Sequence, residues 1–414
     1  ADGDALFPPE AVLDLLRSRL RTAEAAPVAR LRTLRRRVAL RRFDGESLGA
    51  VIAEEISVLD GRRVAGRFRE VDVETEPNAP AELRAAVIDR LRAAGAGPLD
   101  TTPQVVRVLG DRALEPPDLA PVDGLDESAA AGDLVRAAIV ASSARLIGHD
   151  PVVRIGTDPE GVHQARVATR RLRSDLRTFR RLLEPEWNNA LRTELCWIAD
   201  ELGELRDADV LVDRFTRHAD TLTDDDRDHA LALLKRLGDS REDARTRVLD
   251  ALRSRRYLEL LDRLVEATRA PRLLYPDAQE PAATAMPPLV AGPWQHLQNA
   301  VESLGDAAPD EKLHNVRIRA KRARYAAESV EPALGKPARR FAKAIAGVQE
   351  VLGRHQDAVV AERWLRTTAE HAPASELFAA GQLAAIERAD ARATRAEFPK
   401  AWKDANAKRL RDWF

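Results

Sequence analysis

An internal repeat constrains the fold of this chain more than any other feature of its sequence. The pattern His-x-x-Arg-x-x-x-(Arg/Lys)-Arg-x-Arg begins at His163 and again at His314, 151 residues later. Two further matching segments, residues 202–210 and 352–360, follow at an offset of 150. Two separated motifs that repeat within one residue of register predict two copies of one structural unit.

Helical periodicity dominates the chain from residue 129 to its end. Proline and glycine interrupt the pattern at residues 156–159, 184–185, 271–293 and 332–337. We therefore expect an all-α domain over residues 129–414, built of two pseudo-repeated helical bundles. Its halves would cover about 129–270 and 294–414, with a proline-rich loop at 271–293 between them.

The first 111 residues show a different pattern and predict an α+β domain with antiparallel strands. Residues 28–40 and 64–76 have the composition and alternation of strands, and two Asp-Gly turns at hairpin spacing lie between them. Helices are expected at residues 9–21 and 80–94. A linker rich in proline and acidic residues then covers residues 112–128.

The overall charge excludes a generic basic nucleic-acid binder. Lysine and arginine total 66 against 67 acidic residues, and the pI is about 6.8. We expect no specific nucleic-acid partner, and a polyanion site would need local clustering of cations. No apolar run reaches the length of a membrane span, so no membrane partner is expected either.

One cysteine, Cys196, and no visible secretory signal indicate a reducing, cytoplasmic location. The chain begins at Ala1 and its one methionine is Met286, so we expect further sequence upstream.

Each copy of the repeat places its histidine and basic residues on one face of a helix. The spacing of +3, +7 and +10 is that of a helical stripe, with apolar residues on the adjoining face. The first stripe is His163, Arg166, Arg170 and Arg173, and the second is His314, Arg317, Lys321 and Arg324.

Like charges one turn apart repel, so an anion must compensate each stripe. Acidic loops around a solvated basic face would do this, and so would a ligand. The basic face occurs in both halves, and in each it begins with a histidine at the same position of the motif. This recurrence favours a ligand over acidic loops. If the two helices pack as a pair, both stripes face one cleft, where each charge-assisted hydrogen bond contributes about 1.5–3 kcal/mol.

The repeated motif, each time followed by Leu-Gly and then Arg-Asp or His-x-Asp, resembles the CHAD (conserved histidine α-helical domain) family. Tyr325, directly after the second motif, belongs to the same resemblance. The resemblance covers about residues 129–414 and implies two four-helix bundles around a basic pore that binds inorganic polyphosphate. The implied polyphosphate-binding residues are both stripes together with Arg171, Arg322, Arg206, Arg354 and His355. Asp207 and Asp357 would orient their basic partners.

Two departures break the symmetry of the repeat. Arg206 in the first half has Gln356 in its place in the second, and Arg177 has Glu328. The second departure indicates that the basic stripe is longer in the first half.

The region before the linker resembles the later part of a CYTH (triphosphate tunnel) domain. The residues that carry this resemblance are the basic run 30–37 and the strand 68–74. Alternation places Glu70, Asp72 and Glu74 on one face, and the resemblance implies that they hold a divalent cation, Mg or Mn. An amphipathic strand with a solvated acidic side is the alternative. This chain lacks the family's opening Glu-x-Glu-x-Lys strand, so the implied domain is partial.

The sequence therefore predicts a polyphosphate-binding protein that needs no cofactor for binding, with no catalytic residue assigned. The rival is a divalent-metal triphosphatase or polyphosphatase that uses the CYTH-like part, which the upstream strands would have to complete. A helical scaffold for acidic protein surfaces is a third hypothesis. Association with polyphosphate granules is a further expectation, and the oligomeric state stays open.

A di-iron site is a weaker alternative, although a Glu-x-x-His pair occurs in each half, at Glu160 and His163 and at Glu311 and His314. The arginines around both histidines oppose metal binding by their charge.

Overall fold

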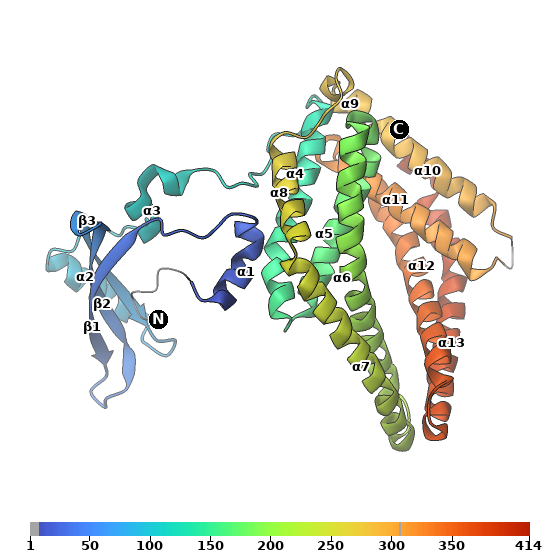
Figure 1. Cartoon of the computed structure of the whole chain (residues 1–414), viewed down its shortest axis with the longest axis horizontal. Helices are drawn as coiled ribbons and strands as arrows, with labels where there is room; N and C mark the ends of the chain where they lie inside the picture. Colours follow the sequence, from blue (N-terminus) through green and yellow to red (C-terminus); the bar gives the residue numbers. More distant parts are fainter. Residues whose placement is uncertain (1–7, 306–307) are drawn as a thin grey trace. The chain divides into compact units, whose positions relative to one another are not determined.

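The computed structural model describes residues 8–305 and 308–414 (Figure 1). The chain divides into two compact units. One comprises residues 24–117, and the other comprises residues 9–23 and 118–414.

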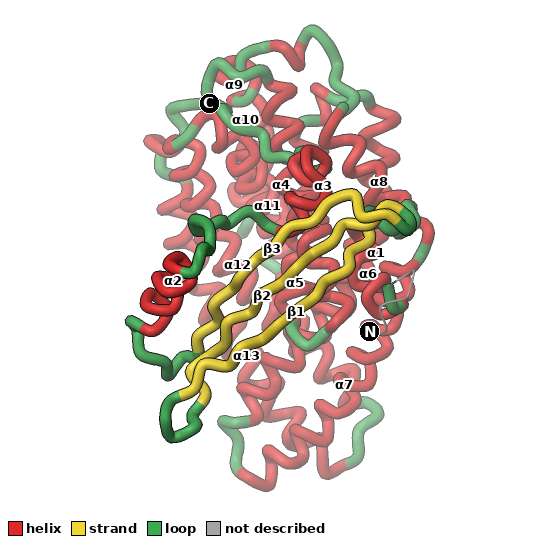
Figure 2. The backbone as a smooth tube through the Cα atoms, turned by 90° about the vertical axis from the view of Figure 1, so that its left-hand side faces the viewer, coloured by secondary structure: helices red, strands yellow, loops and turns green. Residues whose placement is uncertain are grey.

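The smaller unit contains a three-stranded antiparallel sheet (Figure 2). Its strands are β1 (Arg30–Arg41), β2 (Ser47–Asp60) and β3 (Arg63–Thr75), in that spatial order. Two Asp-Gly turns join them, because glycine accepts the positive φ of +92° at Gly45 and +59° at Gly61. The two predicted strands and the antiparallel arrangement are thus confirmed, but the sequence analysis missed β2, which pairs with both of them.

Helix α2 (Leu83–Ala93) packs against β3, and α3 (Gln104–Leu109) continues into the 3₁₀ turn η1 (Gly110–Leu114). The sequence analysis missed α3, whose six residues are too few to show a helical period.

Helix α1 (Glu10–Leu20) corrects the expected domain boundary. The sequence placed it with the strands, but it packs against the helical unit. The Asp14 carboxylate lies 3.0 Å from Nη1 of the buried Arg154, and the Ser18 hydroxyl donates to the carbonyl of Ile147 at 3.3 Å. These partners are more than a hundred residues downstream, where local sequence patterns give no information.

The larger unit is helical throughout, as predicted. Its first half comprises α4 (Ala131–Ile155), α5 (Pro159–Thr178), η2 (Arg180–Leu182), α6 (Pro185–Ala219), α7 (Asp224–Arg253) and α8 (Arg255–Arg269). Its second half comprises η3 (Asp277–Gln279), α9 (Ala282–Ala285), α10 (Pro287–Glu302), α11 (Asp310–Leu334), α12 (Lys336–Ala369), α13 (Ala374–Ala405) and η4 (Lys408–Leu410). Helices α4 to α7 pack consecutively, and so do α10 to α13.

Matching salt bridges reinforce the likeness of the two halves. Glu204 on α6 pairs with Arg247 on α7, and Arg354 on α12 pairs with Glu397 on α13. Each residue of the second pair stands 150 positions after its counterpart, with the charges exchanged. The α6–α7 and α12–α13 hairpins in Figure 1 therefore have a salt bridge at the same position, with the acidic and basic residues exchanged between the two helices.

The predicted loop at 271–293 is only partly present. Helix α10 begins at Pro287 and contains Pro293, so the sequence was wrong about the end of this segment. Pro287 and Pro288 stand in the first turn, where a proline is tolerated because the amide hydrogens there have no intrahelical acceptor, whereas Pro293 lies inside the helix.

The start of α5 fixes the phase of the first basic stripe. Asp158 caps the helix by accepting a hydrogen bond from the backbone N–H of Glu160 at 2.8 Å, and Pro159 occupies the first turn. The preceding helix ends at Gly156, whose φ of +72° is the left-handed conformation that glycine adopts readily.

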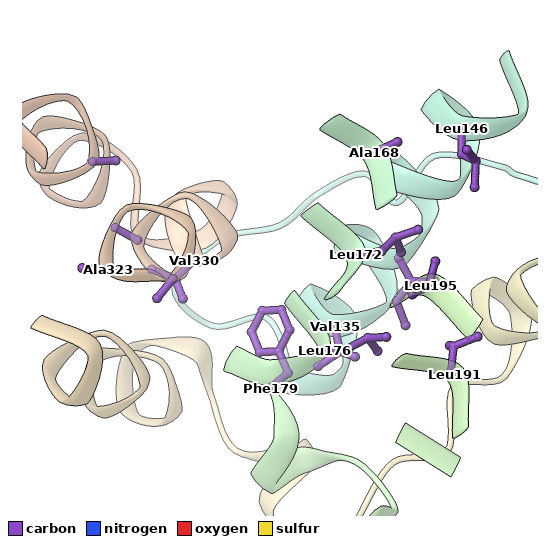
Figure 3. Close-up of a cluster of buried hydrophobic side chains, with 14 of the residues drawn as sticks. Val135, Leu146, Ala168, Leu172, Leu176, Phe179, Leu191, Leu195, Ala323 and Val330 are labelled. Atoms are coloured by element: carbon purple, nitrogen blue, oxygen red, sulfur yellow. The ribbon is translucent and has the colours of Figure 1, made fainter. Parts of the chain in front are cut away.

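One hydrophobic core spans both halves of the helical unit. Phe179, at the end of α5, is 1% exposed, and Figure 3 shows its ring between Val135 and Leu176 on one side and Val330 of α11 on the other. Phe179 thus ties the helix of the first motif to the helix of the second.

We expect Phe179→Ala to lower the free energy of unfolding by about 3–5 kcal/mol, the usual cost of truncating a buried aromatic ring. Phe378→Ala is the matched control, because that ring is 66% exposed and its loss should change stability by less than about 0.5 kcal/mol. Denaturant unfolding of both variants decides, and equal effects would contradict the bridging role.

Candidate anion-binding site

Helices α5 and α11 pack against each other and bring cations from both stripes together. Arg166 and Arg170 come from α5, and Arg317 and Lys321 come from α11. The three arginines lie close enough to Lys321 for each to lower the pKa of its amine. We call these four residues the central cluster.

Among the four cations of the central cluster, Lys321 is the one whose pKa is lowered to near neutrality. Burial, followed by the charges of Arg317, Arg170 and Arg166, lowers the pKa of its amine to about 7. In the described part of the chain its ammonium group has no hydrogen-bond or ion-pair partner. The amine is therefore partly neutral near pH 7, where an exposed lysine is fully charged.

Two arginines of the cluster are incompletely satisfied. The Nε atoms of Arg170 and Arg317 are buried and lack hydrogen-bond partners among the described residues. Burial, opposed by Asp357, lowers the pKa of Arg317, with Arg170 contributing further. A buried donor without an acceptor costs about 1–3 kcal/mol, so these atoms favour an anionic ligand.

Two carboxylates accompany the four cations. Arg166 donates to Oδ1 of Asp207 at 2.5 Å and to the carbonyl of Gly203 at 3.3 Å. Asp357 lies near Arg317 and Lys321, and burial raises its pKa, with Asp207 adding to the effect. The positions expected to orient basic partners therefore do lie beside them, although they offset only part of the positive charge.

The two motif histidines have different surroundings. Burial, followed by the charge of Arg206, lowers the pKa of His163, and Arg170 and Arg166 lower it further. Nδ1 of His314 lies 2.8 Å from Oε1 of Gln356. His163 therefore has the cation Arg206 beside it, whereas His314 has the neutral amide of Gln356 at the equivalent position.

Tyr325 stands at the edge of the central cluster with three guanidinium groups over its ring. The distances to the ring centroid are 5.7 Å from Arg170, 5.7 Å from Arg171 and 5.5 Å from Arg324. Glu328 pairs with Arg171 and, at 2.6 Å, with Nε of Arg324. Of the three cations around the tyrosine, Arg170 alone belongs to the central cluster, and the other two are neutralised.

A cavity of about 900 Å³ adjoins this region within the helical unit. Its lining includes His163, Arg170 and Tyr325, together with side chains of α4 and of the segment 119–125. Of the central cluster, Arg170 belongs to the lining.

The remaining predicted residues lie elsewhere. Arg354 pairs with Glu397, and His355 is buried 3.3 Å from Asp310, with its pKa lowered by burial. Arg173 and Arg322 lie close enough to Arg177 for their charges to lower the pKa of its guanidinium. His355 and Arg354 thus have packing partners on neighbouring helices.

The comparisons with known proteins agree with the helical fold. The sequence profile of the CHAD domain matches residues 137–366. The chain belongs to the CHAD family.

Among its relatives is the uncharacterized protein Rv2226 of Mycobacterium tuberculosis, 31% identical over 398 residues, or 88% of this chain and 72% of the relative. The solved CHAD domain of the plant Ricinus communis matches 68% of this chain and 96% of its own, with 30% identity and a TM-score of 0.54. PptA of Streptomyces chartreusis shares the fold, with a TM-score of 0.57, 24% identity and coverage of 66% of this chain and 100% of its own.

No helix in the described part of this CHAD-family chain is long and apolar enough to cross a membrane.

The strand unit brings three carboxylates together, and two of them, Glu70 and Asp72, belong to the predicted metal-binding set. Carboxylate oxygens of Glu54, Glu70 and Asp72 lie within 4.8 Å of one another, and Glu74 is not part of this group. Glu54 on β2 is directly opposite Glu70 on β3, so their side chains are cross-strand neighbours. Glu74 lies four residues beyond Glu70 along β3, twice as far as Asp72 does.

The three carboxylates offer the oxygen donors that Mg or Mn prefers, so the donor set fits such a cation. The amide of Gln104 donates to Glu54 at 3.0 Å and to Glu70 at 2.7 Å, and Arg35 donates to Glu54 at 2.5 Å. The sequence analysis missed Glu54, although its place opposite Glu70 follows from the hairpin register.

Lys321 generates a prediction about stability and pH. Its folded pKa of about 7 lies below the ordinary value of 10.5, so the unfolded chain binds more protons between these pH values. Stability therefore rises with pH over that window, by at most about 1.4 kcal/mol per pH unit for one group. Lys321→Met should be more stable than the wild type at pH 6, and the difference should shrink between pH 7 and 10.

Denaturant unfolding at several pH values measures this difference. Lys343→Met, at an exposed position of α12, is the control and should show no such trend. A constant difference for Lys321→Met would mean that the lysine titrates normally.

Proposed function

We propose that this protein binds inorganic polyphosphate through the central cluster. The observation that carries the proposal is the convergence of four half-buried cations from two helices, accompanied by only two carboxylates. Arg170, Arg317 and Lys321 have unused donors at this point. A polyanion supplies both the missing charge and the missing acceptors.

Polyphosphate fits the site better than a nucleic acid does. Base recognition by a single-strand binder uses exposed aromatic rings next to a basic groove. Here Trp294 and Trp402 stack on each other in the core, with centroids 5.4 Å apart, and Trp197 lies under Arg256. Tyr325 is covered by arginines. These four rings therefore offer no stacking platform beside the central cluster.

Each residue of the site has a definite role in this proposal. Arg166, Arg170 and Arg317 donate hydrogen bonds to phosphate oxygens, and Lys321 becomes charged when the anion arrives. His163 and His314 sit one turn before the arginines and contribute charge when protonated. In the free protein Asp207 holds Arg166 in place, and bound phosphate competes with Asp207 for Arg166. Cytoplasmic location and association with polyphosphate granules belong to the same proposal.

Charge reversal tests whether both halves contribute. Arg170→Glu and Lys321→Glu lie 151 residues apart, yet each should weaken binding of long-chain polyphosphate at least tenfold, since one lost charge-assisted contact is worth about 1.5–3 kcal/mol. Each should also reduce the dependence of affinity on salt, because fewer counterions are exchanged. Titration at two ionic strengths measures both effects.

Arg392→Glu provides the matched control, because this exposed arginine of α13 undergoes the same charge change outside the cluster. It should bind as the wild type does. A loss confined to either Arg170→Glu or Lys321→Glu would show that the halves act separately.

Binding should weaken as pH rises from 6 to 9. Bound phosphate favours the charged forms of Lys321 and His163 and raises their pKa values, so binding takes up protons wherever these groups are neutral in the free protein. Lys321→Arg should remove the part of the trend above pH 7, because arginine stays charged. His163→Gln should remove the part below it.

Long-chain polyphosphate is the ligand for these titrations, since its few terminal groups contribute little to proton exchange. Identical pH profiles for the wild type and both variants would assign the affinity to the arginines alone.

A second candidate function is hydrolysis of triphosphate by the strand unit. The observation that favours it is the group formed by Glu54, Glu70 and Asp72. A bound Mg or Mn would there neutralise phosphate charge. The full chain with either metal should then release phosphate from tripolyphosphate, and Glu70→Gln should abolish the release. Phosphate release that is absent, or that survives in Glu70→Gln, would rule this function out.

A further inference from the structure

The cavity of about 900 Å³ beside Arg170 has an apolar wall and a polar wall. The apolar wall comes from α4 and from the segment 119–125. It includes Leu119, Val122 and Leu125 of the segment and Ala137, Ala138 and Ala141 of α4. Because alanine side chains are short, this stretch of α4 leaves the space beside it open.

The polar wall carries charged groups that mostly neutralise one another. Arg171 pairs with Asp175 at 3.1 Å and with Glu328, and Arg324 pairs with Glu328 at 2.6 Å. The third carboxylate of the lining, Glu331, pairs at 2.5 Å with an arginine outside the cavity. This balance distinguishes the cavity from the central cluster, in which cations outnumber carboxylates.

Two arginines of the lining stay unpaired. Arg170 of α5 and Arg145 of α4 make no hydrogen bond or ion pair with any other described residue. Arg145 is exposed to solvent, whereas the Nε atom of Arg170 is buried. An excess of positive charge this small matches a ligand with a single anionic group and not a polyanion.

Two buried hydroxyl groups of the lining are also without partners. Ser142 of α4 is 5% exposed and Tyr325 of α11 is 7% exposed, yet neither hydroxyl makes a hydrogen bond within residues 8–305 and 308–414. Helix α4 packs against both α5 and α11, so these hydroxyls and Arg170 converge on one cavity. Buried donors without acceptors cost free energy, and a ligand with acceptor oxygens would satisfy them.

The segment 119–125 is held at its two ends and not in between. Before it, Asp118 accepts a hydrogen bond from Arg21 at 2.8 Å, and after it the backbone N–H of Ala131 donates to the carbonyl of Glu280 at 2.9 Å. Within the described chain, no backbone–backbone hydrogen bond involves the segment itself. A ligand can therefore displace this wall of the cavity without breaking backbone hydrogen bonds.

We propose that the cavity binds a small organic anion whose apolar body lies against α4 and the segment 119–125 and whose head group is held by Arg170, Ser142 and Tyr325. A carboxylate and a phosphate monoester both offer the acceptor oxygens that these donors require. Small-molecule sites have such mostly apolar walls with a few polar groups, and volumes of about 300–1,000 Å³. The inference does not depend on polyphosphate binding, although both ligands would contact Arg170.

Calorimetric titration of the full chain with decanoate and with decyl phosphate, below their micelle concentrations, tests the proposal. One molecule should bind per chain with a negative change in heat capacity, because apolar surface is buried. Acetate and inorganic phosphate lack the apolar body and should bind at least tenfold more weakly. Decyltrimethylammonium has the opposite head charge and should not bind. The tighter of the two decyl ligands identifies the head group.

Two variants locate the binding. Ala141→Phe fills the apolar part of the cavity and should weaken decanoate binding at least tenfold. Ser142→Ala with Tyr325→Phe keeps the shape and removes both hydroxyls, which should weaken it about tenfold, since two hydrogen bonds are lost. Ala393→Phe is the matched control, because this exposed alanine of α13 lies outside the lining. Thermal unfolding of each variant verifies the fold.

The outcomes separate this inference from the proposed function. Ala141→Phe should bind long-chain polyphosphate within twofold of the wild type, and an equal loss of both ligands would make the cavity part of the polyphosphate site and overturn the inference. Unchanged decanoate binding in Ala141→Phe, or an equal loss in Ala393→Phe, would overturn it as well. If the wild type binds polyphosphate and neither decyl ligand, the inference fails and the proposed function stands.

Discussion

Packing of α5 against α11 is the constraint on which the rest of the structure depends. Arg171 of α5 pairs with Glu328 of α11, and the buried Ser329 of α11 donates to the buried Asp175 of α5 at 2.5 Å. These contacts hold the two helices in close approach, and Phe179 adds a large apolar contact with Val330 of α11. The same approach forces the basic faces of both helices into a small volume. Hydrophobic burial across both halves therefore offsets an electrostatic repulsion that the helices would otherwise avoid.

The repulsion and the burial together shift the pKa values of ionisable groups in the site. The amine of Lys321 reaches a pKa of about 7, and Asp357 beside it is also shifted by burial. A site that holds uncompensated charge before the ligand arrives gains more from an anion than a neutral groove does. The two sides of the helix pair differ, because Glu328 neutralises one and Arg177 leaves the other basic.

Several parts of the structure followed from the sequence alone. The repeat, the helical unit, the antiparallel strands and the cations of the central cluster depend on local periodicity and on residue spacing, which a single sequence shows. The parts that failed depend on contacts between distant segments. Helix α1 joins the helical unit through Asp14 and Ser18, and Glu54 reaches Glu70 through strand pairing. The burial of His355 beside Asp310 and Arg395 is another such contact that the motif did not show, and its role in binding stays a prediction.

The most direct test of the account is the structure of the full chain bound to long-chain polyphosphate. The account predicts phosphate groups between α5 and α11, with oxygens within hydrogen-bond distance of Arg170 from the first half and of Arg317 and Lys321 from the second. Phosphate bound to one helix alone, or only outside the helix pair, would contradict the claim that the two halves form one anion site.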